Sequence, residues 1–318
     1  MQIFKNKMTF PTYFETKNSL NLFGLYDNLN FLINLYKEKK LPQILMLSGK
    51  KGCGKSTLIN HLMFFIFDQQ NYNLDTYEFN SSSIFYNHFK DNIYPNIIYL
   101  SGCEFKNTKI EDIRNLKTKI FQTSILNNLR FIILDDVDLF NNNSLNALLK
   151  IIEEPTKNNH FILINNQSRS LIETIKSRCL DIKVILNEKK RQDIILSLIK
   201  KFKINLIIDP EFSQLTPGHF IKFNHVYNDN NISPNDDFLK NLSILLNLYK
   251  KDKDIMFIDM ISYLTDNYFN TLKKKNLFTN ERIIEYKRFV LENINKFFHY
   301  NLNQNALLNT INNKINNE

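Results

Sequence analysis

Short apolar runs alternate with longer stretches of helical periodicity over the first 185 residues of the chain. Runs of strand length lie at 43–47, 96–100, 131–134, 161–165 and 182–185. Between or before them, apolar positions recur at helical spacing in 29–36, 57–67, 110–121 and 144–153. Strands that alternate with helices are typical of a parallel sheet covered on both faces. We therefore predict an α/β domain built on a parallel five-stranded sheet.

The pattern changes after about residue 186. The stretches 188–202 and 217–226 keep a helical period, the polar segment 228–237 contains Pro234 and is typical of a linker, and 238–318 is rich in Leu, Ile and Phe at helical spacing. This pattern predicts three domains: an α/β domain at 1–186, a small helical domain at 187–232 and an all-α domain at 233–318.

Composition and charge narrow the class of protein only a little. The 318 residues include 41 Lys or Arg against 32 Asp or Glu, and this formal charge of +9 is compatible with a nucleic-acid partner. The three cysteines, Cys53, Cys103 and Cys179, form no Cys-x-x-Cys pair, so neither a disulfide framework nor a four-thiolate zinc site is expected. With no run of ~20 apolar residues and no signal-peptide pattern, we expect a cytoplasmic protein without a membrane span.

Glycine marks the first candidate site. The chain has six glycines, and three of them fall in the segment GKKGCGKS, Gly49–Ser56, which matches G-x-x-x-x-G-K-[ST] between a predicted strand and a predicted helix. In this phosphate-binding loop, or P-loop, backbone N–H groups hold phosphates, the lysine reaches the outer phosphates and the serine completes a Mg²⁺ shell. We expect ATP and Mg²⁺ at Gly49, Lys50, Lys51, Gly52, Cys53, Gly54, Lys55, Ser56 and Thr57.

Acidic residues after the predicted strand 131–134 supply the second half of such a site. Asp135 is the candidate Mg²⁺ partner beside Ser56. Asp136 stands where a hydrolysing ATPase of this type usually carries Glu, and its side chain is one methylene shorter. A water placed for Glu would therefore be out of position by about 1 Å, which can lower the rate of ATP hydrolysis on the order of 100-fold. The alternative interpretation is that Asp135, Asp136 and Asp138 form only a strand-end turn.

Four further segments fit one family: LFGLYDNLNFLINLYKEKKLPQILMLSG at 22–49, KIEDIRNLK at 109–117, NALLKIIEEP at 146–155 and FILINNQSRSLIETIKSRC at 161–179. Together with the P-loop they resemble the AAA+ clamp-loader family, most closely the δ′-type subunits of bacterial DNA polymerase III. The resemblance covers about the first 185 residues. It implies an AAA+ domain, a helical lid and an all-α collar that mediates oligomerisation.

The resemblance also assigns roles to single residues. It implies that Asn166 is the sensor-1 residue and that Arg178, in Ser177-Arg178-Cys179, is an arginine finger serving the ATP site of a neighbouring subunit. The implied partners are γ/τ-like and δ-like clamp-loader subunits, with the sliding clamp and primer-template DNA reached through the assembly.

Two departures from the family pattern bear on function. The usual zinc module needs four cysteines between the P-loop and the acidic strand, and Cys103 alone lies there, so no zinc is expected. In hydrolysing members the lid carries G-x-x-R, but here Gly218 is followed at the arginine position by Ile221. Together with Asp136, this predicts that nucleotide binds at the P-loop and is hydrolysed poorly.

Three functional hypotheses remain at this point. The first is a stator subunit of the DNA polymerase III clamp loader, with little ATPase activity of its own. The second is an ATP-hydrolysing motor subunit, resembling the γ/τ subunit or a small clamp-loader subunit. The third is a P-loop kinase of a small metabolite, which leaves NALLKIIEEP and Ser177-Arg178-Cys179 without explanation.

Overall fold

The computed structural model describes residues 11–102, 129–211, 213–234, 236–276 and 278–316. The described chain divides into two compact units. The sheet unit comprises Pro11–Lys203 and Pro210–Ile221, and the helical unit comprises Ile204–Asp209 and the residues from Lys222 onward. The predicted helix at 110–121, the segment KIEDIRNLK and Cys103 lie outside the described residues.

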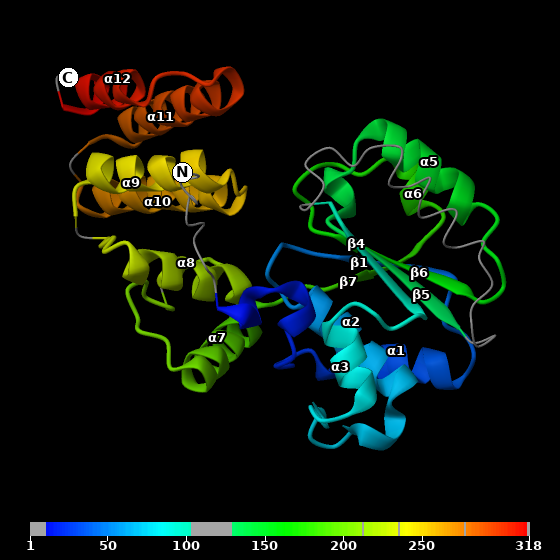
Figure 1. Cartoon of the computed structure of the whole chain (residues 1–318). Coiled ribbons are helices and arrows are strands. Elements are labelled where there is room, and N and C mark those ends of the chain that lie inside the picture. Colours follow the sequence, from blue (N-terminus) through cyan, green and yellow to red (C-terminus); the bar gives the residue numbers. More distant parts are fainter. Residues whose placement is uncertain (1–10, 103–128, 212, 235, 277, 317–318) are drawn as a thin grey trace, which may run out of the picture. The chain divides into compact units, whose positions relative to one another are not determined.

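The sheet unit is built on five parallel strands in the order β4-β5-β6-β1-β7 (Figure 1). The strands are β4 (Ile97–Ser101), β5 (Arg130–Asp135), β6 (Asn159–Asn165), β1 (Ile44–Ser48) and β7 (Leu180–Lys183). The predicted parallel five-stranded sheet is thus confirmed. Strand β7 begins two residues before the predicted run, because an edge strand is only partly covered and its apolar residues do not mark its ends: Ile185, beyond the strand, is 76% exposed.

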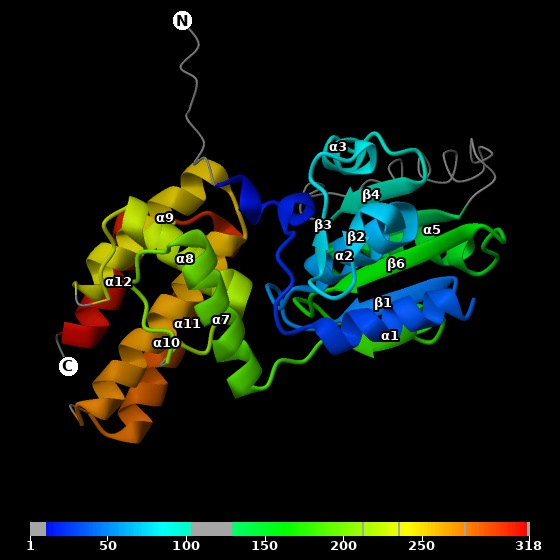
Figure 2. The same cartoon turned by 90° about the horizontal axis from the view of Figure 1, so that it is seen from below.

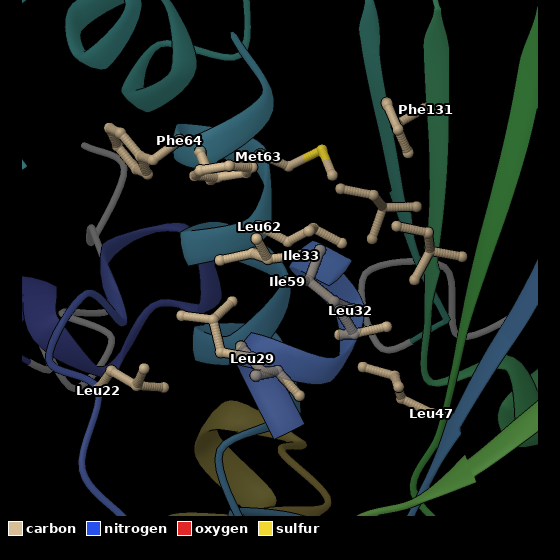
Figure 3. Close-up of a cluster of buried hydrophobic side chains, with 14 of the residues drawn as sticks. Leu22, Leu29, Leu32, Ile33, Leu47, Ile59, Leu62, Met63, Phe64 and Phe131 are labelled. Atoms are coloured by element: carbon tan, nitrogen blue, oxygen red, sulfur yellow. The ribbon is translucent and has the colours of Figure 1, made fainter. Parts of the chain in front are cut away.

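Alternate residues of the central strands face opposite layers of helices. Leu45 and Leu47 of β1 pack with α1 (Tyr26–Lys37), α2 (Lys55–Phe67) and α3 (Ile84–Lys90), whereas Ile44 and Met46 pack with α5 (Asn142–Ile152) and α6 (Glu173–Lys176). Figure 3 shows α1 and α2 meeting the strands around Leu47 and Phe131. This two-sided burial follows from the period of two along a strand.

Smaller elements complete the sheet unit. A two-stranded antiparallel ribbon joins β2 (Tyr72–Asn73) to β3 (Glu78–Phe79). The helix α7 (Glu188–Phe202) follows the sheet. Short 3-10 helices in the described residues are η1 (Thr12–Phe14), η2 (Thr16–Asn18), η3 (Gln69–Asn71) and η4 (Val137–Leu139).

The helical unit confirms the all-α prediction for the C-terminal part of the chain. After α8 (Pro217–Asp229) come α9 (Phe238–Asp252), α10 (Met256–Lys274), α11 (Asn280–Tyr300) and α12 (Gln304–Asn316) (Figure 2). Helix α9 packs against α10 and α12, and α11 packs against α10 and α12, so the four enclose a common core. Its fully buried members include Leu242, Leu245, Met260, Ile261 and Val290. No described helix is both long and apolar enough to cross a membrane.

The linker predicted at 228–237 is shorter in the structure, because α8 continues to Asp229 and Asp237 caps α9 by accepting from the Lys240 N–H. Within the helical unit Phe223 of α8 contacts Tyr263 of α10. The boundaries 1–186, 187–232 and 233–318 stay a prediction.

Candidate functional site

The strand order brings the predicted nucleotide residues together at the carboxyl-terminal end of the sheet. The P-loop follows β1, Asp135 and Asp136 stand at the end of β5, and Asn166 follows β6. Strand β6 lies between β5 and β1, with Asn165 opposite Ser48. The Gly49 N–H donates to the Asn165 carbonyl at 3.1 Å and so joins the start of the P-loop to the end of β6.

The P-loop closes around the ammonium group of Lys55. Its Nζ donates to the carbonyls of Gly49, at 2.6 Å, and Lys50, at 2.9 Å. Only 3% of Lys55 is exposed, and burial lowers its pKa, opposed by the charges of Cys53, Asp135 and Asp138. A cation enclosed by loop carbonyls suits a site that receives anionic phosphates.

Backbone geometry explains two of the loop glycines. Gly52 has φ +81° and Gly54 has φ +97°, in the left-handed region that favours glycine. Gly54 precedes the first turn of α2 and brings no capping side chain. The leading N–H groups of a helix lack intrahelical partners, so those of α2 suit phosphate oxygens.

The first residues of α8 and the segment before them pack against the P-loop. Thr216 Oγ1 donates to the Lys51 carbonyl at 2.6 Å, and the Gly218 N–H donates to the Gly52 carbonyl at 2.8 Å. A Cβ atom on Gly52 would lie 2.6 Å from Thr216 Oγ1. Ile221, at the position of the missing arginine, is 5% exposed and belongs to the core.

The acidic residues form a hydrogen-bonded group. One Asp135 oxygen accepts from the Tyr99 hydroxyl at 2.5 Å and the other from the Asp136 N–H at 2.8 Å. Burial, and next the Asp136 charge, raise the pKa of Asp135 to about 6. Asp136 itself has φ +51° and pairs with Lys51 Nζ at 3.3 Å, and its Oδ1 accepts from the Asn166 amide at 2.7 Å. Asp136 therefore links the P-loop to the predicted sensor.

Three positioning contacts were not predicted. Tyr99 gives no recognisable signal within its strand, and Thr216 lies 165 residues from its acceptor. Asp138 was visible as the third acidic residue, and its carboxylate accepts from the N–H groups of Asn166, at 2.9 Å, and Ser168, at 2.8 Å. It therefore holds the loop that carries the sensor.

Two residues assigned to the nucleotide have other contacts. Thr57 is 6% exposed and its hydroxyl lies 2.6 Å from that of Ser19. Cys53 is 5% exposed, its Sγ donates to the Val184 carbonyl at 3.7 Å, and burial raises its pKa. Cys53 is therefore a buried packing residue.

The residues present fit Mg²⁺ that arrives with phosphates. Within the described parts of the chain, no group of three or more His, Cys, Asp or Glu side chains could hold a metal. Each carboxylate oxygen of Asp135 accepts one hydrogen bond and keeps further acceptor capacity. Mg²⁺ in proteins usually combines one or two protein oxygens with phosphates and waters.

Arg178 lies at the amino-terminal end of the sheet, opposite the end that carries the P-loop. Leu180, two residues after Arg178, pairs with Leu45, four residues before Gly49. At a rise of about 3.3 Å per residue, the start of β7 lies about 13 Å before the level of Gly49. The Arg178 guanidinium donates through Nη1 to the Thr174 carbonyl at 2.8 Å and through Nη2 to Glu153 Oε1 at 2.9 Å. These two hydrogen bonds involve no residue of the P-loop.

Comparison with known proteins gives related sequences. The δ′ subunit of DNA polymerase III from Buchnera aphidicola subsp. Acyrthosiphon pisum is 31% identical over 213 residues, covering 63% of this chain and 61% of its own. A γ subunit from Buchnera aphidicola subsp. Schizaphis graminum is 35% identical over 95 residues, covering 30% of this chain and 26% of its own. The δ′ subunit of Pseudomonas aeruginosa is 36% identical over 74 residues, covering 23% of each chain. The matches thus span 23% to 61% of the length of these relatives.

Among solved structures, a DNA polymerase III γ subunit-related protein from Thermotoga maritima aligns over 88% of this chain and 96% of its own, with a TM-score of 0.43 and 16% identity. The sequence model of one family, described as DNA polymerase III, delta subunit, matches residues 26–187, just over half of the chain. The chain therefore belongs to the DNA polymerase III delta subunit family.

Proposed function

We propose that the chain is a δ′-like stator subunit of the DNA polymerase III clamp loader. In this role it assembles with γ/τ-like and δ-like subunits and supplies Arg178 to the ATP site of a neighbour while the sliding clamp is loaded onto primer-template DNA. The observation that carries the proposal is that Arg178 precedes the amino end of β7 and binds Glu153, whereas the P-loop follows the carboxyl end of β1. A planar guanidinium away from its own P-loop is available to a phosphate held by another chain.

The contacts of Asp136 support the proposal that ATP is hydrolysed only weakly at the chain's own P-loop. A residue that orients water must keep an oxygen directed at that water. Asp136 Oδ1 instead accepts from Asn166 and pairs with Lys51. The carboxylate therefore has a structural task that competes with activation of water, and its reach is one methylene shorter than that of Glu.

Nucleotide binding is part of the proposal. Gly49–Ser56 would hold the phosphates, Lys55 would neutralise them, and Ser56 with Asp135 would hold the hydrated cation. Mg²⁺ supplies charge neutralisation across the phosphates. The cytoplasm, where replication proteins meet DNA, is the proposed location.

The test is a clamp-loader assembly reconstituted with Arg178→Ala. ATP hydrolysis at the neighbouring site should fall by roughly 10³–10⁵, the usual effect of removing such a finger, while this chain's nucleotide affinity stays constant. Arg169→Ala, another exposed arginine of the preceding segment, is the matched control. Equal hydrolysis by the two variants would remove the finger from the proposal.

The motor subunit is the second candidate. It is favoured by the complete P-loop, with Lys55 in place within it, and by the relative from Buchnera aphidicola subsp. Schizaphis graminum that is named a γ subunit. Steady-state ATPase of the isolated chain separates the two: turnover at about 1–100 s⁻¹, as in phosphoryl-transfer kinases, would establish the motor.

A further inference from the structure

The three side chains of Ser177-Arg178-Cys179 all bind carbonyls of α6. Ser177 Oγ donates to the Thr174 carbonyl at 3.2 Å, Arg178 Nη1 to the same carbonyl at 2.8 Å, and Cys179 Sγ to the Ile175 carbonyl at 3.1 Å. The last carbonyls of a helix have no intrahelical partner. The motif therefore ends α6 and binds one terminal nitrogen of the Arg178 guanidinium.

The other terminal nitrogen of the guanidinium is bound by a different element. Glu153 is the first residue after α5, and its Oε1 accepts from Arg178 Nη2 at 2.9 Å. A carboxylate at the C-terminal end of a helix is disfavoured by the helix dipole. The pair is also partly exposed, with 37% of the Arg178 side chain and 48% of the Glu153 side chain accessible. Exposed ion pairs add little stability, so stability does not explain why an acidic residue stands here.

Both acceptors belong to residues whose neighbours along the chain are buried. Glu153 follows Ile152, which is 2% exposed, and Thr174 precedes Ile175, which is fully buried. The two isoleucines belong to one hydrophobic cluster, in which α5 packs against α6. Two fixed acceptors on separate elements define the plane of a guanidinium, because its N–H groups form a rigid fork.

We infer that Glu153 is a positioning residue for Arg178, aiming its guanidinium at the phosphates of a neighbouring subunit. The inference rests on the proposed function. Glu153 acts through Arg178, by holding the guanidinium in one position before the subunits meet. Such preorganisation affects the rate of the neighbour's reaction, since charge stabilisation requires donors that are already in place.

The experiment uses the complete reconstituted assembly with Glu153→Gln, Glu153→Asp, Arg178→Ala and the double variant Glu153→Gln/Arg178→Ala. The matched control is Glu154→Gln, which removes the adjacent exposed carboxylate. Glu153→Gln should lower the neighbour's kcat about 10- to 100-fold with KM for ATP unchanged, as expected for a guanidinium misplaced by up to about 1 Å. Glu154→Gln should match the wild type, and Glu153→Asp should recover part of the rate.

The double variant separates positioning from a general structural effect. If Glu153 acts only through Arg178, the double variant should be no slower than Arg178→Ala alone. Equal rates for Glu153→Gln and Glu154→Gln, a faster rate for Glu153→Gln, or additive losses in the double variant would each overturn the inference. If Arg178→Ala itself leaves the neighbour's ATP hydrolysis unchanged, the proposed arginine finger is refuted as well. If only Glu153→Gln leaves it unchanged, the positioning role alone is refuted.

Discussion

Replacement of Gly52 by alanine should destabilise the sheet unit by about 2 kcal/mol. A left-handed backbone costs an L residue about 1–2 kcal/mol, and Gly52 has φ +81°. The new Cβ would lie 2.6 Å from Thr216 Oγ1, so the hydroxyl must leave the Lys51 carbonyl. Loss of that hydrogen bond adds about 0.5–1.5 kcal/mol. Alanine also restricts the unfolded chain, which offsets about 0.4–1 kcal/mol.

The assay is urea unfolding of the intact protein, with nucleotide affinity measured beside it. Gly218→Ala tests the contact without the backbone cost, because Gly218 is not among the glycines with positive φ, and its Cβ would lie 2.8 Å from Gly52 Cα. Because that Cβ would meet backbone atoms of the P-loop, which move less readily than a hydroxyl, we expect Gly218→Ala to be destabilising as well. Lys50→Ala, in the same loop but exposed, should stay within about 0.5 kcal/mol of the wild type. A Gly52→Ala protein as stable as Lys50→Ala would refute the reasoning.

Three other predictions concern pH, nucleotide and metal. Burial lowers the pKa of His61 to about 4, so its contribution to stability is complete above pH ~6.5 and is lost toward pH ~4 at up to about 1.4 kcal/mol per pH unit. Since the raised pKa of Asp135 acts in the opposite direction, the measurement is the difference between wild type and His61→Gln across pH 4–7, and a constant difference would contradict it. The isolated chain should bind a fluorescent ATP analogue and hydrolyse ATP slowly. Lys55→Ala should abolish binding, and Asp136→Glu should raise turnover. If Lys55→Ala bound the analogue as well as the wild type, the P-loop would be excluded as the binding site. Elemental analysis of chelator-free protein should find no zinc, and stoichiometric zinc would show that Cys103 has partners the sequence does not reveal.

The P-loop is predicted from a local pattern. A P-loop is eight consecutive residues between a strand and a helix, so the position of Lys55 follows from the sequence alone. The pairs that organise the site could not be predicted in the same way. Lys51 and Asp136 are 85 positions apart, and only the strand order β5-β6-β1 brings their elements together. Likewise, nothing in NALLKIIEEP indicates that Glu153, and not Glu154, meets Arg178.

The region between α2 and β4 was not predicted, and its elements show why. Strands β2 and β3 have two residues each, too few for any periodicity. Their place depends on tertiary contacts, such as Phe79 stacked on Phe64 at 4.3 Å between ring centroids and the Tyr72 hydroxyl 2.8 Å from His61 Nδ1. These contacts join separate elements and leave no local signal.

The two ends of the parallel sheet carry different features, so the subunit is polar. The residues predicted to bind nucleotide lie at the carboxyl ends of β1, β5 and β6, while Arg178 precedes the amino end of β7. If Arg178 serves a neighbour as proposed, the surfaces that meet are different on the two chains, and contacts of that kind extend head to tail until a ring closes. An arc that stops short of closure has unequal ends: one terminal subunit keeps a finger with no loop to serve, and the other keeps a loop that no finger reaches. The position of a subunit in such an arc would then decide whether its P-loop, its Arg178 or both meet a neighbour.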